Sequence, residues 1–295
     1  MGEGEVHPMR FVVLGASGYI GEAVQGAIRA QGHSVVAVSR HGRAATGAHG
    51  VALNMQRDPV GSLLDGVDGV LNLVGIIRET PAEGITYQAL HVDATAKLVE
   101  AALKAGTPRY VQMSALGVSP RGGSRYFETK WEAEQLVRER LPQAVVVRPS
   151  LVFGGHADFF ATLSGLAKNP VVPVPGDGHA LFDPVFRGNL ATVLASLLSA
   201  PAQDVAGQVY EIGGPVRMTL DAMIDWVAEV AGRRPPVPKL HMPLGLMRPL
   251  VSLGERVPAF PLTTDQLRML NVPNITDDAR WHTWVPEPTP PGHDW

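Results

Sequence analysis

The residues with the clearest chemical use are Tyr126 and Lys130, which lie four positions apart in a segment that begins near Ser124. Residues at this spacing share one face of a helix, so the phenol and the ammonium group can point into one site. A lysine charge there would lower the pKa of the phenol, which suits Tyr126 to pass a proton to or from a carbonyl group. Ser114, which ends the preceding apolar segment, would assist. The same spacing also fits an ordinary helix with a half-buried tyrosine and an exposed lysine.

A second pattern is a turn with three glycines, Gly15, Gly18 and Gly21, which follows the apolar run 11–14 and precedes a helical pattern. Gly15 permits a tight turn, Gly18 lets backbone N–H groups approach phosphate oxygens, and Gly21 lets the helix pack on the strand. The partial positive charge of a helix N-terminus adds to this anion site. The pattern favours a dinucleotide pyrophosphate, and the alternative is a plain strand-to-helix connection.

The end of the second apolar run, 34–39, indicates which dinucleotide would bind. A site for NAD carries an acidic residue there, about twenty residues beyond the last glycine, to bind the ribose hydroxyls. This chain has Arg40 and Arg43 instead. A guanidinium pairs with a 2′-phosphate, so the sequence favours NADP(H) and keeps NAD(H) as the alternative. Both arginines could also be solvated loop charges.

Alternating apolar runs and helical patterns must position these residues. Strands are expected near 10–14, 34–39, 69–74, 109–114 and 144–148, and helices near 19–31, 59–65, 87–105, 125–140, 189–199 and 219–231. This alternation predicts an α/β fold, a Rossmann-type doubly wound parallel sheet with a smaller C-terminal substrate lobe. Prolines become frequent beyond Pro149. We therefore expect a dinucleotide-binding domain over 9–150 and a substrate or partner lobe over 151–295, with some later segments returning to the main sheet.

Composition narrows the function further. The 295 residues include no cysteine, which excludes thiolate chemistry and disulfides and fits a reducing, cytoplasmic compartment. The net charge of −3 gives no attraction to nucleic acid. No apolar run is long enough to cross a bilayer, although peripheral attachment at the inner membrane stays open. His156 and Asp158 are too few ligands for a metal site, so no metal is expected.

An apolar cluster in the C-terminal part has several interpretations. It consists of Leu246, Met247, Leu250, Val251 and Leu253. Such a cluster most often packs in the core of a small lobe, and it could instead meet a quinone, a lipid surface or a protein partner. A protein partner, a homo-oligomer and an unidentified small-molecule substrate all stay open.

Several motifs together resemble one family. They are the glycine turn 15–21, the segment 72–75, Ser114, the Tyr126/Lys130 pair and the segment 148–154. In combination they resemble the short-chain dehydrogenase/reductase superfamily, in its extended or atypical branch of NAD-dependent epimerases and dehydratases. Within it, segments such as 114–117 and 210–215 look like bacterial relatives of the nucleotide-binding accessory subunit of respiratory complex I.

The resemblance implies further cofactor contacts. It places Ser17, Tyr19 and Ile20 at the pyrophosphate, and Ser39 with Arg40 and Arg43 at the adenosine ribose phosphate. Asn54 and Met55 would flank the adenine, and Val74 and Gly75 would line the ribose path. Tyr126 and Lys130 would lie at the ribose and reaction centre, and Pro149, Ser150 and Val152 near the nicotinamide.

Two departures from the family pattern bear on catalysis. Extended members usually have two consecutive serines after the strand and use the second, whereas this chain has Ser114 followed by Ala115. The asparagine that often supports the lysine is replaced around His91. The pair Ser114 and Ala115 favours a non-catalytic protein, whereas the intact Tyr126/Lys130 pair favours catalysis, and on that pair we expect an NADP(H)-dependent oxidoreductase acting on a carbonyl, alcohol or quinone-like substrate. The alternatives are a non-catalytic NADPH-binding structural or redox-sensing subunit, and a nucleotide-sugar epimerase or dehydratase.

Overall fold

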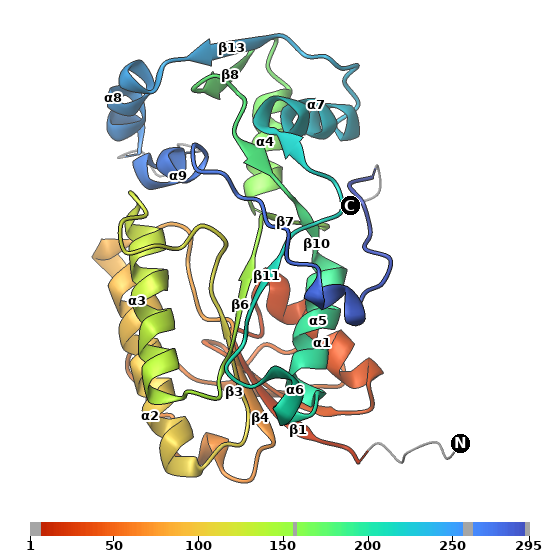
Figure 1. Ribbon diagram of the computed structural model, residues 1–295. Helices are drawn as coiled ribbons and strands as arrows, with labels where there is room; N and C mark the ends of the chain where they lie inside the picture. Colours follow the sequence, from red (N-terminus) through yellow and green to blue (C-terminus); the bar gives the residue numbers. More distant parts are fainter. Residues whose placement is uncertain (1–6, 156–157, 256–261, 293–295) are drawn as a thin grey trace.

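The structure, a computed structural model, describes residues 7–155, 158–255 and 262–292 and has a seven-stranded sheet at its centre (Figure 1). All neighbouring strands in the sheet are parallel, in the order β11-β6-β5-β4-β1-β2-β3. The strands are β1 (Arg10–Leu14), β2 (Ser34–Ser39), β3 (His49–Ala52), β4 (Gly69–Asn72), β5 (Tyr110–Met113), β6 (Val145–Pro149) and β11 (Val209–Ile212). The predicted doubly wound parallel sheet is confirmed.

Each predicted strand is present, and two further strands complete the sheet. Strand β3 is a sheet edge with mostly exposed residues, so it lacks the apolar run that marks a buried strand. Strand β11 pairs with β6, with Tyr210 beside Val147, although about sixty residues separate the two strands in the chain. Sequence pattern alone does not report such a long-range pairing.

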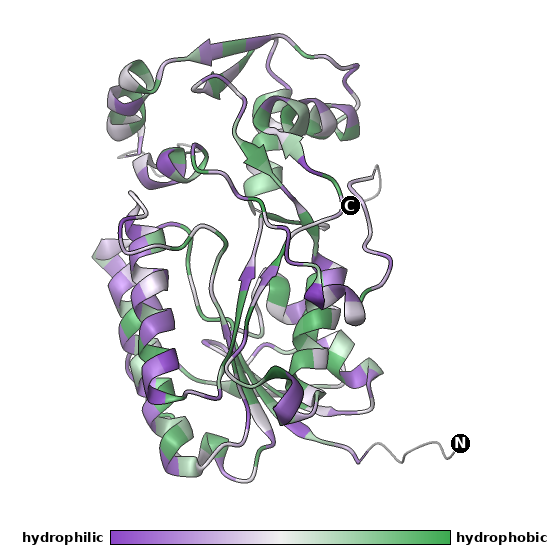
Figure 2. Ribbon diagram, in the orientation of Figure 1, coloured by the Kyte–Doolittle hydropathy of each residue, from purple (hydrophilic) through white to green (hydrophobic). Residues whose placement is uncertain are grey.

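The helices cover both faces of the sheet. Alternate residues of β1 point to opposite faces. Phe11 and Val13 pack with the face that carries α1 (Tyr19–Ala30) and α5 (Arg187–Ser199), whereas Val12 and Leu14 pack with the face that carries α2 (Ala94–Ala105) and α3 (Arg125–Arg140). Figure 2 shows hydrophobic central strands beside a largely hydrophilic α3.

The predicted helices are confirmed with two differences. The segment expected as one helix over 87–105 begins with a π-helical turn, η3 (Gln88–Asp93), before α2. The segment expected over 59–65 is a single 3₁₀ turn, η1 (Gly61–Leu64). Shorter elements are η2 (Pro81–Glu83), α6 (Ala202–Val205) and η4 (Arg280–Thr283).

A second lobe, upper in Figure 1, forms beyond β6 around its own apolar core. It contains the helices α4 (Asp158–Ala167), α7 (Leu220–Val230), α8 (Leu244–Gly254) and α9 (Thr264–Met269). Three short strand pairs join it, namely β7 (Val152–Phe153) with β10 (Val185–Phe186), β9 (Leu181–Phe182) with β12 (Met218–Thr219), and β8 (Val172–Pro175) with β13 (Lys239–Met242). The chain after β6 thus contributes both this lobe and, through α5 and β11, part of the main sheet.

The apolar cluster on α8 is divided between two environments. Val251 is buried, whereas Leu246, Leu250 and Leu253 are 57–66% exposed. The expectation that this cluster packs in the core is therefore met on the inner side of α8, at Val251, and not on its outer side. None of the helices in the described part of the chain has the length and hydropathy needed to span a membrane. His156 and the side chain of Asp158 lie outside the described residues.

Candidate functional site

The three glycines form a tight turn between β1 and α1. Gly15 has φ +78°, which side-chain-bearing residues rarely adopt, and its N–H donates to the carbonyl of Val38 at 3.0 Å. A methyl group at Gly21 would overlap the carbonyl oxygen of Gly15 and lie 2.7 Å from Ala16 Cα. Gly18 stands at the N-cap of α1. The turn therefore brings the first N–H groups of α1, from Tyr19 onward, to the end of the sheet where an anion can approach.

A buried glutamine that sequence reasoning missed holds this turn in place. The Gln25 amide nitrogen donates to the carbonyls of Ala16 at 2.8 Å and Gly21 at 3.2 Å, and its oxygen accepts from the N–H of Ala45 at 2.8 Å. Gln25 thus joins the glycine turn to the loop after β2, which carries Arg40. In the sequence, the only indication of this role was that Gln25 is a single amide side chain on the apolar face of α1.

Arg187 lies beside the first turn of α1. Its guanidinium stacks 4.8 Å from the ring centre of Tyr19 and donates to the carbonyl of Tyr19 at 3.3 Å. The Tyr19 hydroxyl donates to the carbonyl of Gly154. Burial raises the pKa of Tyr19 to about 12, against the opposite effect of the Arg187 charge. A positive charge therefore reinforces the helix N-terminus, and no local pattern predicts it because 168 positions separate Arg187 from Tyr19.

The residues expected at the adenosine end lie in the loops after β2 and β3. The Ser39 hydroxyl donates to the carbonyl of Arg43 at 3.2 Å, which shapes the loop. Arg40 and Arg43 are exposed, and within the described part of the chain no ion pair engages their guanidinium groups. Asn54 caps the next turn by accepting from the N–H of Gln56 at 3.0 Å. Met55, beside it, is buried at the end of the sheet.

Lys130 lies directly against the segment after β4. Its ammonium group donates to the carbonyl of Met113 at 3.1 Å, and a methyl group at Gly75 would lie 3.1 Å from Nζ. The predicted ribose-path glycine and the predicted lysine are therefore neighbours. Val74 is fixed by its N–H, which donates to the side-chain oxygen of Asn72 at 3.1 Å. Burial lowers the pKa of Lys130 to about 8.

Tyr126 lies in the first turn of α3, one helical turn before Lys130. Ser124 caps this helix by accepting from the N–H of Phe127 at 3.1 Å. The Asp265 carboxylate, from α9, accepts from the N–H groups of Arg125 at 2.8 Å and Tyr126 at 3.0 Å. Two acceptors, one local and one distant, therefore fix the helix end that carries the phenol.

The electrostatics of Tyr126 differ from the sequence prediction. Burial raises the pKa of its phenol to about 12, so the predicted lowering by Lys130 is wrong. The ring packs edge-on against Tyr87 and His91, which leaves it partly buried. Tyr126 is consequently a neutral phenol at pH 7, in the form that can donate a proton.

His91 occupies the wide turn η3 and replaces the usual asparagine. Its Nδ1 lies 2.9 Å from the hydroxyl of Thr129, which donates to the carbonyl of Arg125, and its Nε2 lies 3.2 Å from the N–H of Ile76. Nε2 also lies 3.1 Å from the carbonyl oxygen of Ile76, so each neutral tautomer finds partners: a proton on Nδ1 is accepted by Thr129, and a proton on Nε2 by the Ile76 carbonyl. Burial, aided by the Lys130 charge, lowers the pKa of His91 to about 2. A neutral ring therefore holds the loop before Ile77 against α3.

Ser114 is engaged in a buried ionic network. Its hydroxyl donates to Glu134 at 3.0 Å, and Glu134 also accepts from two nitrogens of Arg148 at 3.0 Å and 2.6 Å. Ala115 follows it with a methyl group alone. In the described part of the chain no hydrogen bond joins Ser114 to Tyr126, so a catalytic part for Ser114 stays a prediction.

Residues at the end of β6 are held by the C-terminal segment. The Ser150 hydroxyl donates to the side-chain oxygen of Asn274 at 2.6 Å, and Asn274 in turn donates to the carbonyl of Leu116 at 3.0 Å. Pro149 ends β6 beside β11, and Val152 begins β7. Asn274 is a positioning residue that carried no local signal, because it acts 124 positions away from Ser150.

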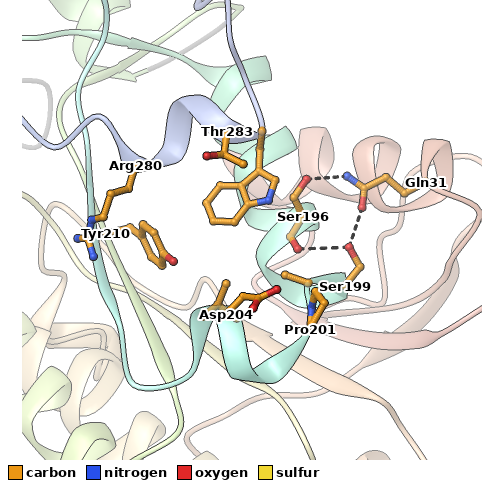
Figure 3. Close-up of a pocket in the computed structure, with 11 residues that line it drawn as sticks. Gln31, Ser196, Ser199, Pro201, Asp204, Tyr210, Arg280 and Thr283 are labelled. Atoms are coloured by element: carbon orange, nitrogen blue, oxygen red, sulfur yellow. Dashed lines mark hydrogen bonds between the residues drawn. The ribbon is translucent and has the colours of Figure 1, made fainter.

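A cavity of about 560 Å³ lies at the C-terminal end of α1, away from the glycine turn (Figure 3). Since α1 has 12 residues, about 18 Å separates its two ends. Figure 3 shows Gln31 hydrogen-bonded to Ser196 and Ser199 at this cavity, and Arg280 near Tyr210. It contains none of the predicted site residues. The residues predicted for the cofactor and for the reaction lie at the other end of the sheet.

The geometry fits a dinucleotide. The first turn of α1 and Arg187 suit a pyrophosphate, the exposed Arg40 suits a phosphate at the adenosine end, and Lys130 beside Gly75 suits a ribose hydroxyl. These groups follow one another along the carboxyl end of the parallel sheet, where open α/β folds bind nucleotides.

Residues 11–213 match the model of the NAD dependent epimerase/dehydratase family. The chain therefore belongs to that family, within the short-chain dehydrogenase/reductase fold. The match ends before α7, so the helices α7, α8 and α9 lie beyond it.

Similar proteins include both a respiratory subunit and a reductase. The chain is 26% identical to the mitochondrial NADH dehydrogenase (ubiquinone) 1 alpha subcomplex subunit 9 of Arabidopsis thaliana, over 94% of this chain and 72% of that protein. It is 37% identical to a 3-diazoavenalumate denitrifying reductase of a Streptomyces species, over 39% of this chain and 40% of that protein. The resemblance to the complex I accessory subunit is confirmed.

A solved structure shares the fold. MoeE5 in complex with UDP-glucuronic acid and NAD superimposes with a TM-score of 0.71, at 20% identity, over 94% of this chain and 92% of that one. At this identity the likeness extends to the fold alone.

Proposed function

We propose that this protein is an NADP(H)-dependent oxidoreductase that interconverts a carbonyl and an alcohol. The observation that carries the proposal is the site on α3, where neutral Tyr126 lies one turn from Lys130 and Lys130 lies against Gly75. The family membership supports a nicotinamide cofactor, and Arg40 and Arg43 in place of an acidic residue support the phosphorylated form.

The residues divide the work of the reaction. The chemistry that NADPH would supply here, when bound, is a hydride for the carbonyl carbon. Tyr126 donates its proton to the carbonyl oxygen, so that the product is an alcohol. Lys130, one helical turn further along α3 and against Gly75, would hold a ribose hydroxyl. His91 and Asp265 are positioning residues, since they act on the loop after Gly75 and on the end of α3.

The test is NADPH oxidation in the presence of a panel of carbonyls and quinones, comparing the parent protein with Tyr126→Phe. The phenylalanine keeps the ring contacts and removes the proton donor. A loss of about a hundredfold or more in kcat, with NADPH binding retained, is expected for general acid catalysis. Equal rates in the two proteins would contradict the assigned acid.

A second candidate is a non-catalytic NADPH-binding subunit of a larger assembly. The observation that favours it is the pair Ser114 and Ala115, because the hydroxyl of Ser114 is bound to Glu134 and Ala115 offers none. The relative from Arabidopsis thaliana, a subunit of a respiratory enzyme, adds support. Tight NADPH binding without turnover of any substrate in the panel would favour this candidate.

A nucleotide-sugar substrate receives less support. It needs basic residues for its diphosphate, and three of the arginines after β6 are engaged elsewhere, which leaves the exposed Arg234, Arg248 and Arg268 in the described part of the C-terminal lobe. Arg217 is paired with Asp183 and Asp277, and Arg233 donates to two backbone carbonyls. Arg187 is stacked on Tyr19, on the cofactor side.

A further inference from the structure

An apolar cavity of about 270 Å³ lies inside the second lobe, between α4, α7, α8 and α9. We call it the lobe cavity. Leu163 and Leu166 of α4, Ile224 of α7, and Met247 and Val251 of α8 contribute to its wall. Thr162 and Gln266 are the polar residues of the lining, and no charged side chain of the described residues lines it.

The lobe cavity adjoins the acid–base site through two segments. Ile77 lines the cavity, and the Tyr87 hydroxyl donates to the carbonyl of Ile77 at 2.9 Å, while the Tyr87 ring packs on Tyr126. Gln266 also lines the cavity, and its neighbour Asp265 binds the N–H of Tyr126. In Figure 1, α9 accordingly lies over the end of α3 that carries Tyr126.

The chemistry of the wall selects the ligand. A diphosphate or a carboxylate would lose its hydration in this cavity without gaining a cation, which is strongly unfavourable. A hydrocarbon chain loses nothing and gains the burial of its apolar surface. The volume is at the lower end of ligand cavities, which suits a chain or a small ring more than a nucleotide.

The position of the lobe cavity in the chain agrees with a specificity site. The family match ends at residue 213, whereas Leu220, Ile224, Met247, Val251 and Leu270 all follow it. The cofactor half thus follows the family, whereas the wall of the lobe cavity is shared: Leu163 and Leu166 of α4 lie inside the match, and the residues from α7, α8 and α9 lie beyond it.

We infer that the lobe cavity binds the hydrocarbon part of an apolar carbonyl or alcohol substrate, with the substrate oxygen at Tyr126. This inference rests on the proposed function and names its substrate class. In the reductive direction the ketone gains a hydride from NADPH at carbon and a proton from Tyr126 at oxygen, yielding a secondary alcohol and NADP⁺.

The first experiment measures kcat/KM for NADPH-dependent reduction of straight-chain 2-ketones from four to ten carbons. Each methylene that enters the cavity is expected to raise kcat/KM about fourfold, until the cavity is filled. A value that does not change with chain length, in a protein that does turn over, would overturn the inference and leave the proposed function intact.

The second experiment measures binding without turnover. Calorimetry with 2-decanone uses the Tyr126→Phe protein saturated with NADPH, with and without Met247→Trp, which fills the cavity. Leu246→Trp is the matched control, because Leu246 is the adjacent α8 residue and is 65% exposed. We expect at least a tenfold weaker affinity for Met247→Trp and no change for Leu246→Trp.

The outcomes separate the two claims. Binding that is lost in Met247→Trp, in a protein whose parent reduces no ketone, would support the lobe cavity and contradict the proposed function. Equal affinity in both tryptophan variants would overturn the cavity assignment. If Met247→Trp fails to fold, judged by its thermal transition, Leu166→Trp on α4 fills the cavity from the opposite wall and replaces it.

Discussion

At the scale of single residues, burial determines the protonation states in the acid–base site. It raises the pKa of Tyr126 to about 12 and lowers the pKa of Lys130 to about 8, so at pH 7 the phenol is neutral and most lysine is charged. This pair suits proton donation to a carbonyl more than proton abstraction from an alcohol.

Arg40 tests the preference for the phosphorylated cofactor. Arg40→Asp replaces an exposed cation by an anion, which would repel the 2′-phosphate and accept from the ribose hydroxyls of NAD(H). We expect the dissociation constant for NADPH to rise at least tenfold, with little change or a gain for NADH, in fluorescence titrations. Equal losses for the two cofactors would refute the phosphate contact. Arg57→Asp, also in an exposed loop, is the control for a general charge effect.

His91 predicts a pH dependence of stability. Its pKa is about 2 in the folded protein and near 6.5 when unfolded, so the unfolded chain binds one more proton between these values. Stability should therefore fall as the pH drops below 6.5, by up to about 1.4 kcal/mol per pH unit from this group. Urea unfolding at pH 8 to 5 measures this slope.

The variant His91→Asn isolates that contribution. It should be less stable than the parent at pH 8, by roughly 1–3 kcal/mol because the Ile76 contact is altered, and should lose less stability toward pH 5. The exposed His49→Asn is the matched control and should follow the parent. Parallel slopes for His91→Asn and the parent would show that the ring is not held neutral.

At the scale of elements, helix ends bring the reacting groups together. The N-terminus of α1 forms the proposed pyrophosphate site, and the N-terminus of α3 carries Tyr126. Each end is secured from outside its own helix, by Arg187 for α1 and by Asp265 for α3. Site geometry therefore depends on segments that lie beyond the first half of the chain.

Asp265 tests this dependence for α3. Asp265→Ala leaves the N–H groups of Arg125 and Tyr126 without their acceptor and should lower the free energy of unfolding by about 1–2 kcal/mol. The rate of NADPH oxidation should also fall, and Asp265→Asn should restore part of both. Glu128→Ala, which removes an exposed pair with Arg125, should change stability by less than about 0.5 kcal/mol. If the two alanine variants behaved alike, the cap would have no special role.

At the scale of the whole molecule, one buried network connects the sheet to both halves of the chain. Arg148 of β6 binds Glu134 of α3 and Glu211 of β11, and Glu211 accepts from Thr276 of the C-terminal segment. Burial acts to lower the pKa of Arg148, but the hydrogen bonds that Arg148 donates to the two glutamates, together with their negative charges, outweigh burial and raise the pKa. The charges therefore form a connected set that runs from the buried Glu134 to the partly exposed Glu211.

Glu134→Ala tests the network. The substitution would leave the Arg148 charge partly buried without its bidentate partner, so we expect a loss of about 3–5 kcal/mol in the free energy of unfolding. Guanidinium chloride unfolding followed by tryptophan fluorescence measures it. Glu132→Ala, exposed on the same helix, should stay within about 0.5 kcal/mol of the parent. If Glu134→Ala lowered the free energy of unfolding by less than about 1 kcal/mol, the claim that this network stabilises the fold would be contradicted.

The amino-acid sequence by itself determined the local features of this protein. Apolar runs predicted five of the seven central strands, and glycine spacing predicted the turn at Gly15, because these properties depend on neighbouring residues. The pair Tyr126 and Lys130 was predicted for the same reason, since four positions make one helical turn.

Tertiary structure alone decided which distant residues complete the site. Arg187, Asp265 and Asn274 act on partners more than a hundred positions away, and no periodicity encodes such contacts. It also reversed the pKa expected for Tyr126, because burial depends on everything that packs around the ring. The lobe cavity arises in the same way, from four helices whose inner faces meet only when the chain is folded.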